Sequence, residues 1–252
     1  MYDNTLKGKT GIVTAAGNGI GQAITDVALR GGANLILNDL DQASLNSYNE
    51  QANTICVPGD ACDLDHIKEL VQLATHHFGQ LDFVVANAGL TEFGDFFDFT
   101  PAQFRKVIDL NLQGTFFLVQ GAASQMRLQN TGGRIILISS VIGQRAYPGL
   151  TAYAMSKAAL MMMARNLVTE LSPYKITINC IAPGATLTPR TAQEEDNYES
   201  TWSKLVPLGK VCYPHDIAAA THFLLSEAAG HITGQTITID GGWSAVSKLP
   251  HH

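Results

Sequence analysis

The chain has 252 residues, of which 46% are hydrophobic and 15% charged, and its formal net charge is −6 at pH 7. An acidic balance without a basic run argues against nucleic-acid binding, and no stretch approaches the ~20 apolar residues that cross a bilayer. The four cysteines form no Cys-x-x-Cys pair and the eight histidines no metal-ligand spacing, so we expect a cytoplasmic protein without a metal site.

Predicted strands and helices alternate along the whole chain. Strands are expected near 9–14, 34–38, 53–57, 81–86, 133–139, 175–181 and 235–239, and helices near 19–31, 42–51, 64–78, 101–128, 151–172 and 214–226. This alternation predicts an α/β protein in which residues 1–252 form one Rossmann-fold domain. Its sheet is expected to be doubly wound, parallel and seven-stranded, with helices on both faces. Ligands of such sheets bind at the carboxyl ends of the strands.

The first predicted strand turns through several glycines into the first predicted helix, in the segment Gly11 to Arg30. Glycines let the backbone approach a ligand, and a helix N-terminus offers free N–H groups to a pyrophosphate. The segment is not a Walker A loop, because no Gly-Lys-Ser/Thr follows. We therefore expect a dinucleotide at this turn, contacted by Thr14, Gly17, Asn18, Gly19, Ile20 and Gly21.

The second predicted strand ends at Asp39, eighteen residues after Gly21. A dinucleotide-binding βαβ unit places there the acid that binds the adenosine ribose hydroxyls. A carboxylate at this point repels a 2′-phosphate, and the neighbouring Asn18 and Leu40 offer no positive charge to hold one. The sequence therefore favours NAD over NADP.

Tyr153 and Lys157 are four residues apart in a predicted helix, so both side chains lie on one helical face. A free tyrosine titrates near pH ~10, and a neighbouring positive charge favours its phenolate form. We expect Lys157 to lower the pKa of Tyr153 and make it a usable acid and base.

With these motifs the chain resembles the short-chain dehydrogenase/reductase family, over about residues 7–243. The family motif Thr-Gly-x-x-x-Gly-x-Gly matches Thr14 to Gly21, except that the first glycine is Ala15. The family motif Asn-Ala-Gly matches Asn87, Ala88 and Gly89, after a predicted strand. The resemblance implies that this second motif also lies against the cofactor.

The resemblance further implies a catalytic tetrad of Asn111, Ser140, Tyr153 and Lys157. In that reading Ser140 and Tyr153 bind the substrate oxygen, Lys157 also holds the nicotinamide ribose, and Asn111 positions a proton-carrying water. Asp60, with Ala61, matches the acid that contacts the adenine amino group. The segment that binds the nicotinamide carboxamide corresponds to Pro183, Gly184, Thr186 and Thr188.

The implied activity is NAD-dependent interconversion of a secondary alcohol with a ketone or aldehyde by hydride transfer. Two alternatives stay open: a 3-oxoacyl-acyl-carrier-protein reductase, and a sensor that binds NAD without chemistry. The irregular segment 185–213 is expected to be a mobile lid over the substrate. Residues expected to contact substrate are Thr91, Gln144, Arg145 and Tyr147, a polar and aromatic set that suits a small sugar, polyol or hydroxy compound.

The resemblance also predicts a homotetramer. The helices that carry Asn111 and Tyr153 correspond to the pair that forms a four-helix interface in this family. The run Leu160 to Met163 gives the second helix an adaptable apolar surface for such a contact.

Overall fold

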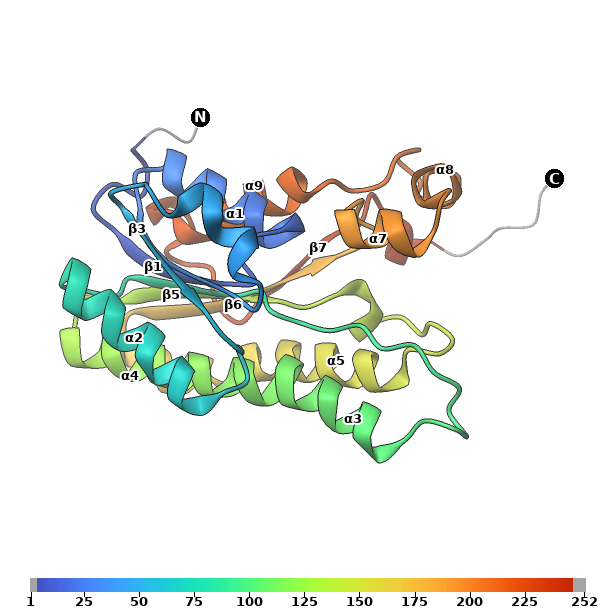
Figure 1. Ribbon diagram of the computed structural model, residues 1–252, viewed down its shortest axis with the longest axis horizontal. Helices are drawn as coiled ribbons and strands as arrows, with labels where there is room; N and C mark the ends of the chain where they lie inside the picture. Colours follow the sequence, from blue (N-terminus) through green and yellow to red (C-terminus); the bar gives the residue numbers. More distant parts are fainter. Residues whose placement is uncertain (1–3, 247–252) are drawn as a thin grey trace.

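The computed structural model describes residues 4–246. Its centre is one parallel sheet, and Figure 1 shows this sheet lying between two layers of helices. The strands are β1 (Thr10–Thr14), β2 (Asn34–Asp39), β3 (Thr54–Pro58), β4 (Phe83–Ala86), β5 (Gly133–Ile138), β6 (Ile176–Pro183) and β7 (Thr236–Ile239). Their order is β3-β2-β1-β4-β5-β6-β7, and each neighbouring pair is parallel. The predicted seven-stranded, doubly wound α/β fold is confirmed.

The long helices cover both faces of the sheet, as predicted (Figure 1). One face carries α1 (Gly19–Arg30) and α9 (Pro214–Leu225), and the other carries α2 (Leu64–Phe78), α4 (Thr115–Gln129) and α5 (Thr151–Asn166). Local capping residues determine where these helices begin and end. Asp63 caps α2 by accepting hydrogen bonds from the backbone N–H groups of Asp65 and His66, and Gly79 ends that helix at φ 79°.

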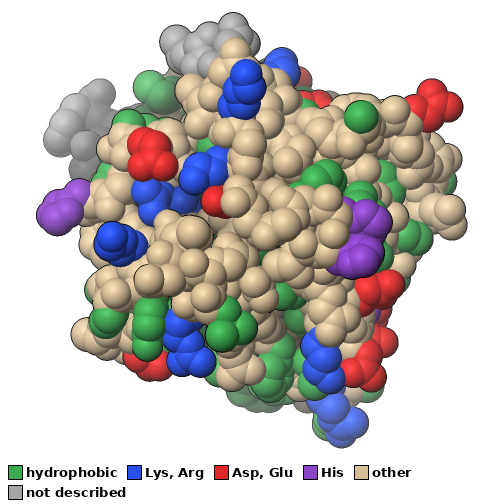
Figure 2. Space-filling model, turned by 90° about the vertical axis from the view of Figure 1, so that its left-hand side faces the viewer, with side chains coloured by type: hydrophobic (Ala, Val, Ile, Leu, Met, Phe, Trp, Pro, Cys, Tyr) green, Lys and Arg blue, Asp and Glu red, His purple; other side chains and the backbone are tan. Residues whose placement is uncertain are grey.

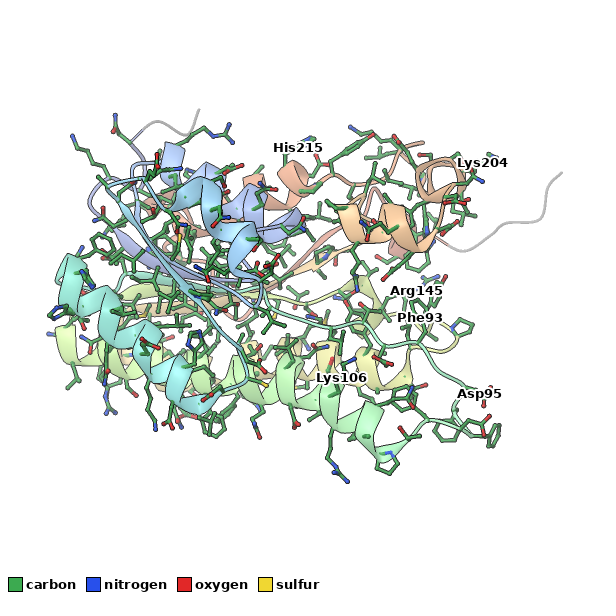
Figure 3. All side chains as sticks on the ribbon, viewed as in Figure 1. Phe93, Asp95, Lys106, Arg145, Lys204 and His215 are labelled. Carbon is green, nitrogen blue, oxygen red and sulfur yellow. The ribbon has the colours of Figure 1, made fainter. Side chains whose placement is uncertain are left out.

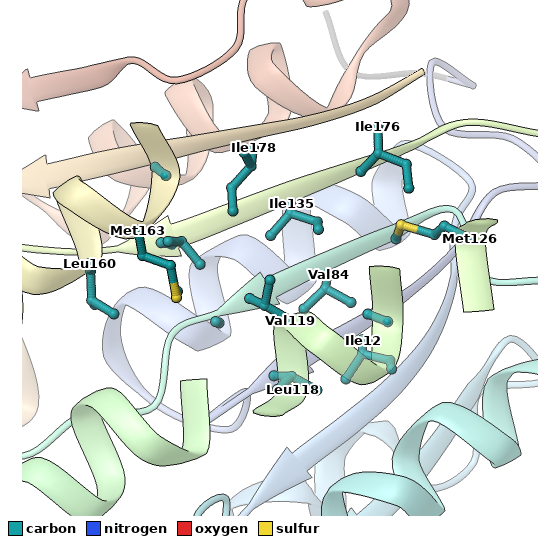
Figure 4. Packing of buried hydrophobic residues seen from close by; sticks show 14 of the residues in the cluster. Ile12, Val84, Leu118, Val119, Met126, Ile135, Leu160, Met163, Ile176 and Ile178 are labelled. Carbon is teal, nitrogen blue, oxygen red and sulfur yellow. The ribbon is translucent and has the colours of Figure 1, made fainter. Parts of the chain in front are cut away.

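Two apolar cores lie on the two faces of the sheet. The larger contains Ile135 and Ile178 from the strands together with Val119 and Met126 from α4, and Figure 4 shows part of it. The other packs α1 and α9 against the opposite side chains of the same strands. The central strands are buried on both faces, so their sequences are nearly continuous apolar runs. Such runs can be recognised from the sequence alone.

Three predicted helices differ from the structure. The segment expected at 42–51 is a 3₁₀ helix over Gln42–Tyr48. The helix expected at 101–128 consists of α3 (Pro101–Ile108), a π-helical turn over Asp109–Gly114, and α4. The helix expected at 151–172 ends at Asn166 and is followed by the short α6 (Val168–Leu171) and a 3₁₀ turn over Ser172–Tyr174. Pro173 accounts for the end of α6, because a proline cannot continue an α-helix.

The segment 185–213, which we call the lid, is more regular than expected. It contains two short helices, α7 (Pro189–Glu194) and α8 (Tyr198–Ser203), and a parallel bridge between Thr186 and Cys212 joins its two ends. Between residues 4 and 246, no helix is both long and apolar enough to span a membrane.

Candidate active site

The glycine turn after β1 is held by side chains of β1 and of the segment that follows β4. The Thr14 hydroxyl accepts hydrogen bonds from the backbone N–H groups of Asn87 and Ala88, each at 3.0 Å. In return, the Asn87 amide donates to the carbonyls of Thr14 and Ala15. A Cβ at Gly21 would lie 1.8 Å from the Ala15 carbonyl oxygen, so only glycine fits there. The turn is thus rigid before any ligand binds.

Ala15 has the left-handed backbone φ of +48°. L-residues pay a steric cost in this region, whereas glycine does not. This conformation accounts physically for the glycine in the related motif, and it makes Ala15 a strained residue in this chain.

Asp39 lies at the carboxyl end of β2, beside the glycine turn. One carboxylate oxygen accepts a hydrogen bond from the Gly17 N–H at 2.9 Å, and the other accepts one from the Asp41 N–H at 3.2 Å. Leu40 is 77% exposed and brings no charge. The arrangement fits the adenosine half of a dinucleotide, because a carboxylate with free lone pairs lies next to a turn whose backbone can approach a pyrophosphate.

The loop after β3 is braced by the Asp60 carboxylate, which accepts a hydrogen bond from the Cys62 N–H at 3.0 Å. The Ala61 carbonyl packs so closely on Gly114 that a Cβ there would lie 2.5 Å from it. The structure therefore brings Asp60 and Ala61 to the same sheet edge as Asp39.

Tyr153, Ser140 and Thr91 form the polar centre of the site. Ser140 follows β5, Tyr153 lies in the first turn of α5, Thr91 lies in the segment after β4, and all three side chains line one cavity. Burial raises the pKa of Tyr153, while the neighbouring hydroxyls of Ser140 and Thr91 and the charge of Arg190 oppose that rise. The expected net lowering is therefore wrong for this geometry, because removal from water outweighs the groups that stabilise the phenolate.

Lys157 lies one turn further along α5 and is 3% exposed. Its ammonium donates a hydrogen bond to the Ile138 carbonyl at 2.8 Å, and it lies 5.7 Å from the centre of the Tyr153 ring. Burial lowers the pKa of Lys157 to about 8. The neighbouring Ser139 hydroxyl donates to the Lys157 carbonyl and so fixes the helix on β5.

Asn111 lies in the π-helical turn and is fully buried. Its side-chain oxygen accepts from the Leu90 N–H at 2.7 Å, while its amide group donates to the Leu90 carbonyl and to the Ser156 hydroxyl. A Cβ at Gly89 would come within 3.0 Å of the Lys157 nitrogen and 3.5 Å of the Asn111 side-chain oxygen. The four residues predicted as catalytic are thus brought together, with Asn111 holding the chain next to Lys157.

A cavity of about 370 Å³ opens over this centre. Among the residues predicted to bind cofactor, it is lined by Ile20, Asn87, Gly89, Tyr153, Lys157, Pro183, Gly184, Thr186 and Thr188. The other predicted cofactor residues lie along the carboxyl ends of β1 to β4, outside the cavity. The cavity therefore contains the residues that were predicted to lie near the nicotinamide and the substrate.

The four predicted substrate residues separate into two pairs. Thr91 and Tyr147 line the cavity. Gln144 and Arg145 do not: Gln144 donates to the Met161 sulfur, and Arg145 donates to the Ser244 carbonyl at 2.7 Å and lies over the Trp243 ring at 5.7 Å. The substrate role of this pair stays a prediction, and both side chains have contacts outside the cavity.

Several cavity residues were not predicted. Phe93 and Trp243 carry no motif, although both follow a motif or strand that was recognised. Figure 3 labels Phe93 and Arg145 on the side of the molecule where α7 and α8 lie. The lid adds Arg190, Thr191, Glu194, Glu195, Tyr198 and Trp202. Within residues 4–246, no group of three or more His, Cys, Asp or Glu side chains could hold a metal ion.

Comparison with known proteins agrees with this architecture. Residues 14–244 match the family model described as "Enoyl-(Acyl carrier protein) reductase". The chain is 34% identical to a 3-oxoacyl-[acyl-carrier-protein] reductase of Thermotoga maritima over 244 residues, which is 94% of this chain and 98% of the relative. It is equally 34% identical to an L-rhamnose 1-dehydrogenase (NAD(P)(+)) of Azotobacter vinelandii, over 93% of this chain and 96% of the relative.

These relatives cover nearly the whole chain and are oxidoreductases that act on CH–OH groups or the corresponding carbonyls. The chain therefore belongs to the short-chain dehydrogenase/reductase family and is an oxidoreductase that uses a nicotinamide cofactor.

Proposed function

We propose that the protein interconverts a secondary alcohol and a ketone or aldehyde with NAD(H), and that its substrate is a sugar, polyol or other small polar hydroxy compound. The observation that carries the proposal is the convergence of the Ser140 and Tyr153 hydroxyls in one cavity, above the buried Lys157 and beside the nicotinamide segment. Such a cluster binds one oxygen atom and moves one proton.

In the oxidation direction, Ser140 donates a hydrogen bond to the substrate oxygen and orients it toward Tyr153. The Tyr153 oxygen takes the hydroxyl proton as a phenolate, the form that the neighbouring Ser140 and Thr91 hydroxyls and the charge of Arg190 favour. Asn111 acts as a positioning residue, because it holds the Leu90 backbone and Ser156. When bound, the nicotinamide supplies the hydride acceptor.

The preference for NAD rests on Asp39. Its carboxylate lies beside the Gly17 N–H, where ribose hydroxyls could donate to it and a 2′-phosphate would be repelled. Residues proposed to hold the cofactor are Thr14, Gly17, Asn18, Gly19, Ile20, Gly21, Asp39, Leu40, Asp60, Ala61, Asn87, Ala88, Gly89, Tyr153, Lys157, Pro183, Gly184, Thr186 and Thr188.

A 3-oxoacyl-acyl-carrier-protein reductase is the second candidate, because relatives of that printed name are 34–35% identical over nearly the full length. The cavity favours the first candidate. Glu194 and Glu195 of the lid line it, and their carboxylates can accept hydrogen bonds from the hydroxyl groups of a small substrate.

A substrate screen tests the proposal and separates the candidates. The protein is mixed with NAD or NADP and a panel of sugars, polyols and secondary alcohols, and separately with NADPH or NADH and a 3-oxoacyl thioester, while absorbance of the reduced cofactor is followed. We expect NADH to form with at least one sugar or polyol. Turnover confined to NADPH and the thioester would favour the reductase, and cofactor binding without any turnover would favour a sensor.

We also propose a homotetramer of single-domain subunits in the cytoplasm. Phe116, Phe117 and Met162 are 36–52% exposed on α4 and α5, and the predicted run Leu160 to Met163 contributes only Met162 to that surface. An apolar hollow between these helices continues the same surface. Acidic and basic side chains are interspersed on the face in Figure 2. A ~27 kDa monomer in sedimentation at micromolar concentration would reject the assembly.

A further inference from the structure

Five aromatic side chains form one wall of the catalytic cavity: Phe93, Tyr147, Tyr198, Trp202 and Trp243. Trp202 is at the centre of the group. It stacks on Tyr147 with an interplanar angle of 24° and a centroid distance of 6.3 Å, and it meets Trp243 edge to face at 5.6 Å. Tyr198 packs beside it on the same helix at 6.0 Å.

The contacts of Trp202 join three distant segments. Trp202 belongs to α8 in the lid, Tyr147 to the loop between Ser140 and α5, and Trp243 to the turn after β7. Arg145 holds Trp243 in place by lying over its ring and binding the Ser244 carbonyl. The wall is therefore fixed from both sides. Tyr147, Tyr198, Trp202 and Trp243 are half-buried, Phe93 is exposed, and all five line the cavity.

The lid brings charge to the same cavity. Arg190, Glu194 and Glu195 line it together with Thr191, and Arg190 forms an ion pair with Glu194 at 3.7 Å. Carboxylates accept hydrogen bonds from hydroxyl groups, and a guanidinium donates them. The cavity thus combines a flat aromatic surface with groups that bind several hydroxyls at once.

Among small hydroxy compounds, a sugar in its ring form matches this combination best. One face of the ring presents C–H groups, which pack on an aromatic ring, and its rim carries hydroxyls. An open-chain polyol has no rigid face and loses more conformational entropy when it is ordered. A hydroxy acid would place its carboxylate near Glu194, Glu195 and Arg190, where the two carboxylates outnumber the one guanidinium and the net charge is negative.

We propose that Trp202 is a specificity-determining residue on which the ring of a cyclic sugar stacks, so that the site takes ring-form sugars in preference to open-chain polyols and hydroxy acids. The inference rests on the proposed oxidation of a small hydroxy compound and specifies its substrate class. Trp202 takes no part in the proton or hydride transfer, since those steps belong to Ser140 and Tyr153.

The experiment compares wild type with Trp202→Ala and Trp202→Phe, and uses Phe97→Ala as a control, because Phe97 is 92% exposed and does not line the cavity. Glucose, galactose and rhamnose are each tested against the alditol obtained by their reduction. Initial rates with NAD give kcat and KM. Calorimetric titration of the NADH-bound protein gives sugar affinity without turnover.

For ring-form sugars we expect Trp202→Ala to raise KM and the calorimetric Kd roughly tenfold to a hundredfold while kcat changes less than about threefold, as for loss of an aromatic contact. Trp202→Phe should keep the Kd for ring-form sugars within about threefold of wild type. For alditols, KM and Kd should change less than about twofold in every variant. The inference is overturned if no ring-form sugar binds, or if Trp202→Ala weakens sugars and alditols equally. Tight sugar binding that depends on Trp202 but gives no NADH would refute the proposed oxidation and leave the inference intact.

Discussion

The floor and the lid of the cavity are built in opposite ways. The floor is formed by Ser140, Tyr153, Lys157 and Asn111. The side chains of Ser140, Lys157 and Asn111 hydrogen-bond backbone groups of Ile142, Ile138 and Leu90, and Lys157 and Asn111 are 3% and 0% exposed. The lid consists of two six-residue helices that are too short to be stable alone, and its aromatic side chains are held mainly by other rings.

This difference separates chemistry from recognition. Proton transfer needs groups fixed to a fraction of an ångström, which backbone hydrogen bonds on a packed sheet provide. Substrate choice needs only a surface of the right shape and charge, which the exposed lid can change without disturbing the floor. Substitutions in the floor should therefore change the rate or the cofactor affinity, and substitutions in the lid should change which substrates the protein prefers.

Removing the floor's proton-transfer group should have the largest effect. Tyr153→Phe should lower kcat roughly 10²- to 10⁴-fold, because the phenol oxygen that exchanges the substrate proton is gone. NAD affinity, measured by calorimetry, should stay within about threefold, because a single ribose contact is lost at most. Tyr174→Phe, outside the cavity, is the matched control and should keep full activity.

The adenosine end of the floor should control cofactor choice. Asp39→Ala should weaken NAD roughly tenfold to a hundredfold, because one charged hydrogen-bonding partner is lost, and the further change Leu40→Arg should supply a partner for a 2′-phosphate. The ratio of kcat/KM for NAD and NADP measures the effect. Asp41→Ala, at the next acid along the chain, should leave the ratio unchanged. An unchanged ratio in Asp39→Ala would show that this carboxylate only braces the Gly17 turn.

The buried positive charge of Lys157 in the floor should lower the free energy of unfolding. The pKa of Lys157 is lowered from 10.5 to about 8, so below pH 8 the folded protein carries a buried ammonium, and between pH 8 and 10.5 only the unfolded chain retains that proton. Stability therefore rises with pH across this window. Lys157→Met should abolish turnover yet stabilise the fold by about 2 kcal/mol at pH 7, after loss of the hydrogen bond to Ile138.

Urea unfolding at pH 7 and pH 10 measures this gain, which should shrink at the higher pH. The exposed Lys204→Met is the control and should change stability by less than about 0.5 kcal/mol. A destabilised Lys157→Met, or a gain that grows with pH, would contradict the cost assigned to burial.

The smallest effect is expected at the strained turn. Ala15→Gly should raise the free energy of unfolding by about 0.5 kcal/mol, because relief of the left-handed strain at φ +48° exceeds the extra entropy of glycine in the unfolded chain. Ala16→Gly is the matched control. Its φ is not positive and its side chain is fully buried, so it should destabilise. Thermal unfolding of the two variants decides whether the turn is strained.

The contrast between floor and lid also explains which features could be predicted from the sequence. The fold followed from buried strands with continuous apolar runs, and the floor followed from short motifs such as Tyr153 and Lys157 on one helical face. The aromatic wall could not be predicted from the sequence, because Tyr147 and Trp202 are far apart in the chain and no periodicity links them. The direction of the Tyr153 pKa and the engagement of Arg145 with Trp243 depend on burial and packing, which only the three-dimensional structure supplies.

One ratio tests the division between floor and lid most directly: kcat/KM for a ring-form sugar divided by kcat/KM for its alditol. It is measured in wild type, in Ser140→Ala and in Trp202→Ala. The account predicts that Ser140→Ala lowers both efficiencies and leaves the ratio within about twofold, whereas Trp202→Ala lowers the ratio roughly tenfold or more. An unchanged ratio in Trp202→Ala, or a ratio that moves in Ser140→Ala, would contradict the separation of chemistry from recognition.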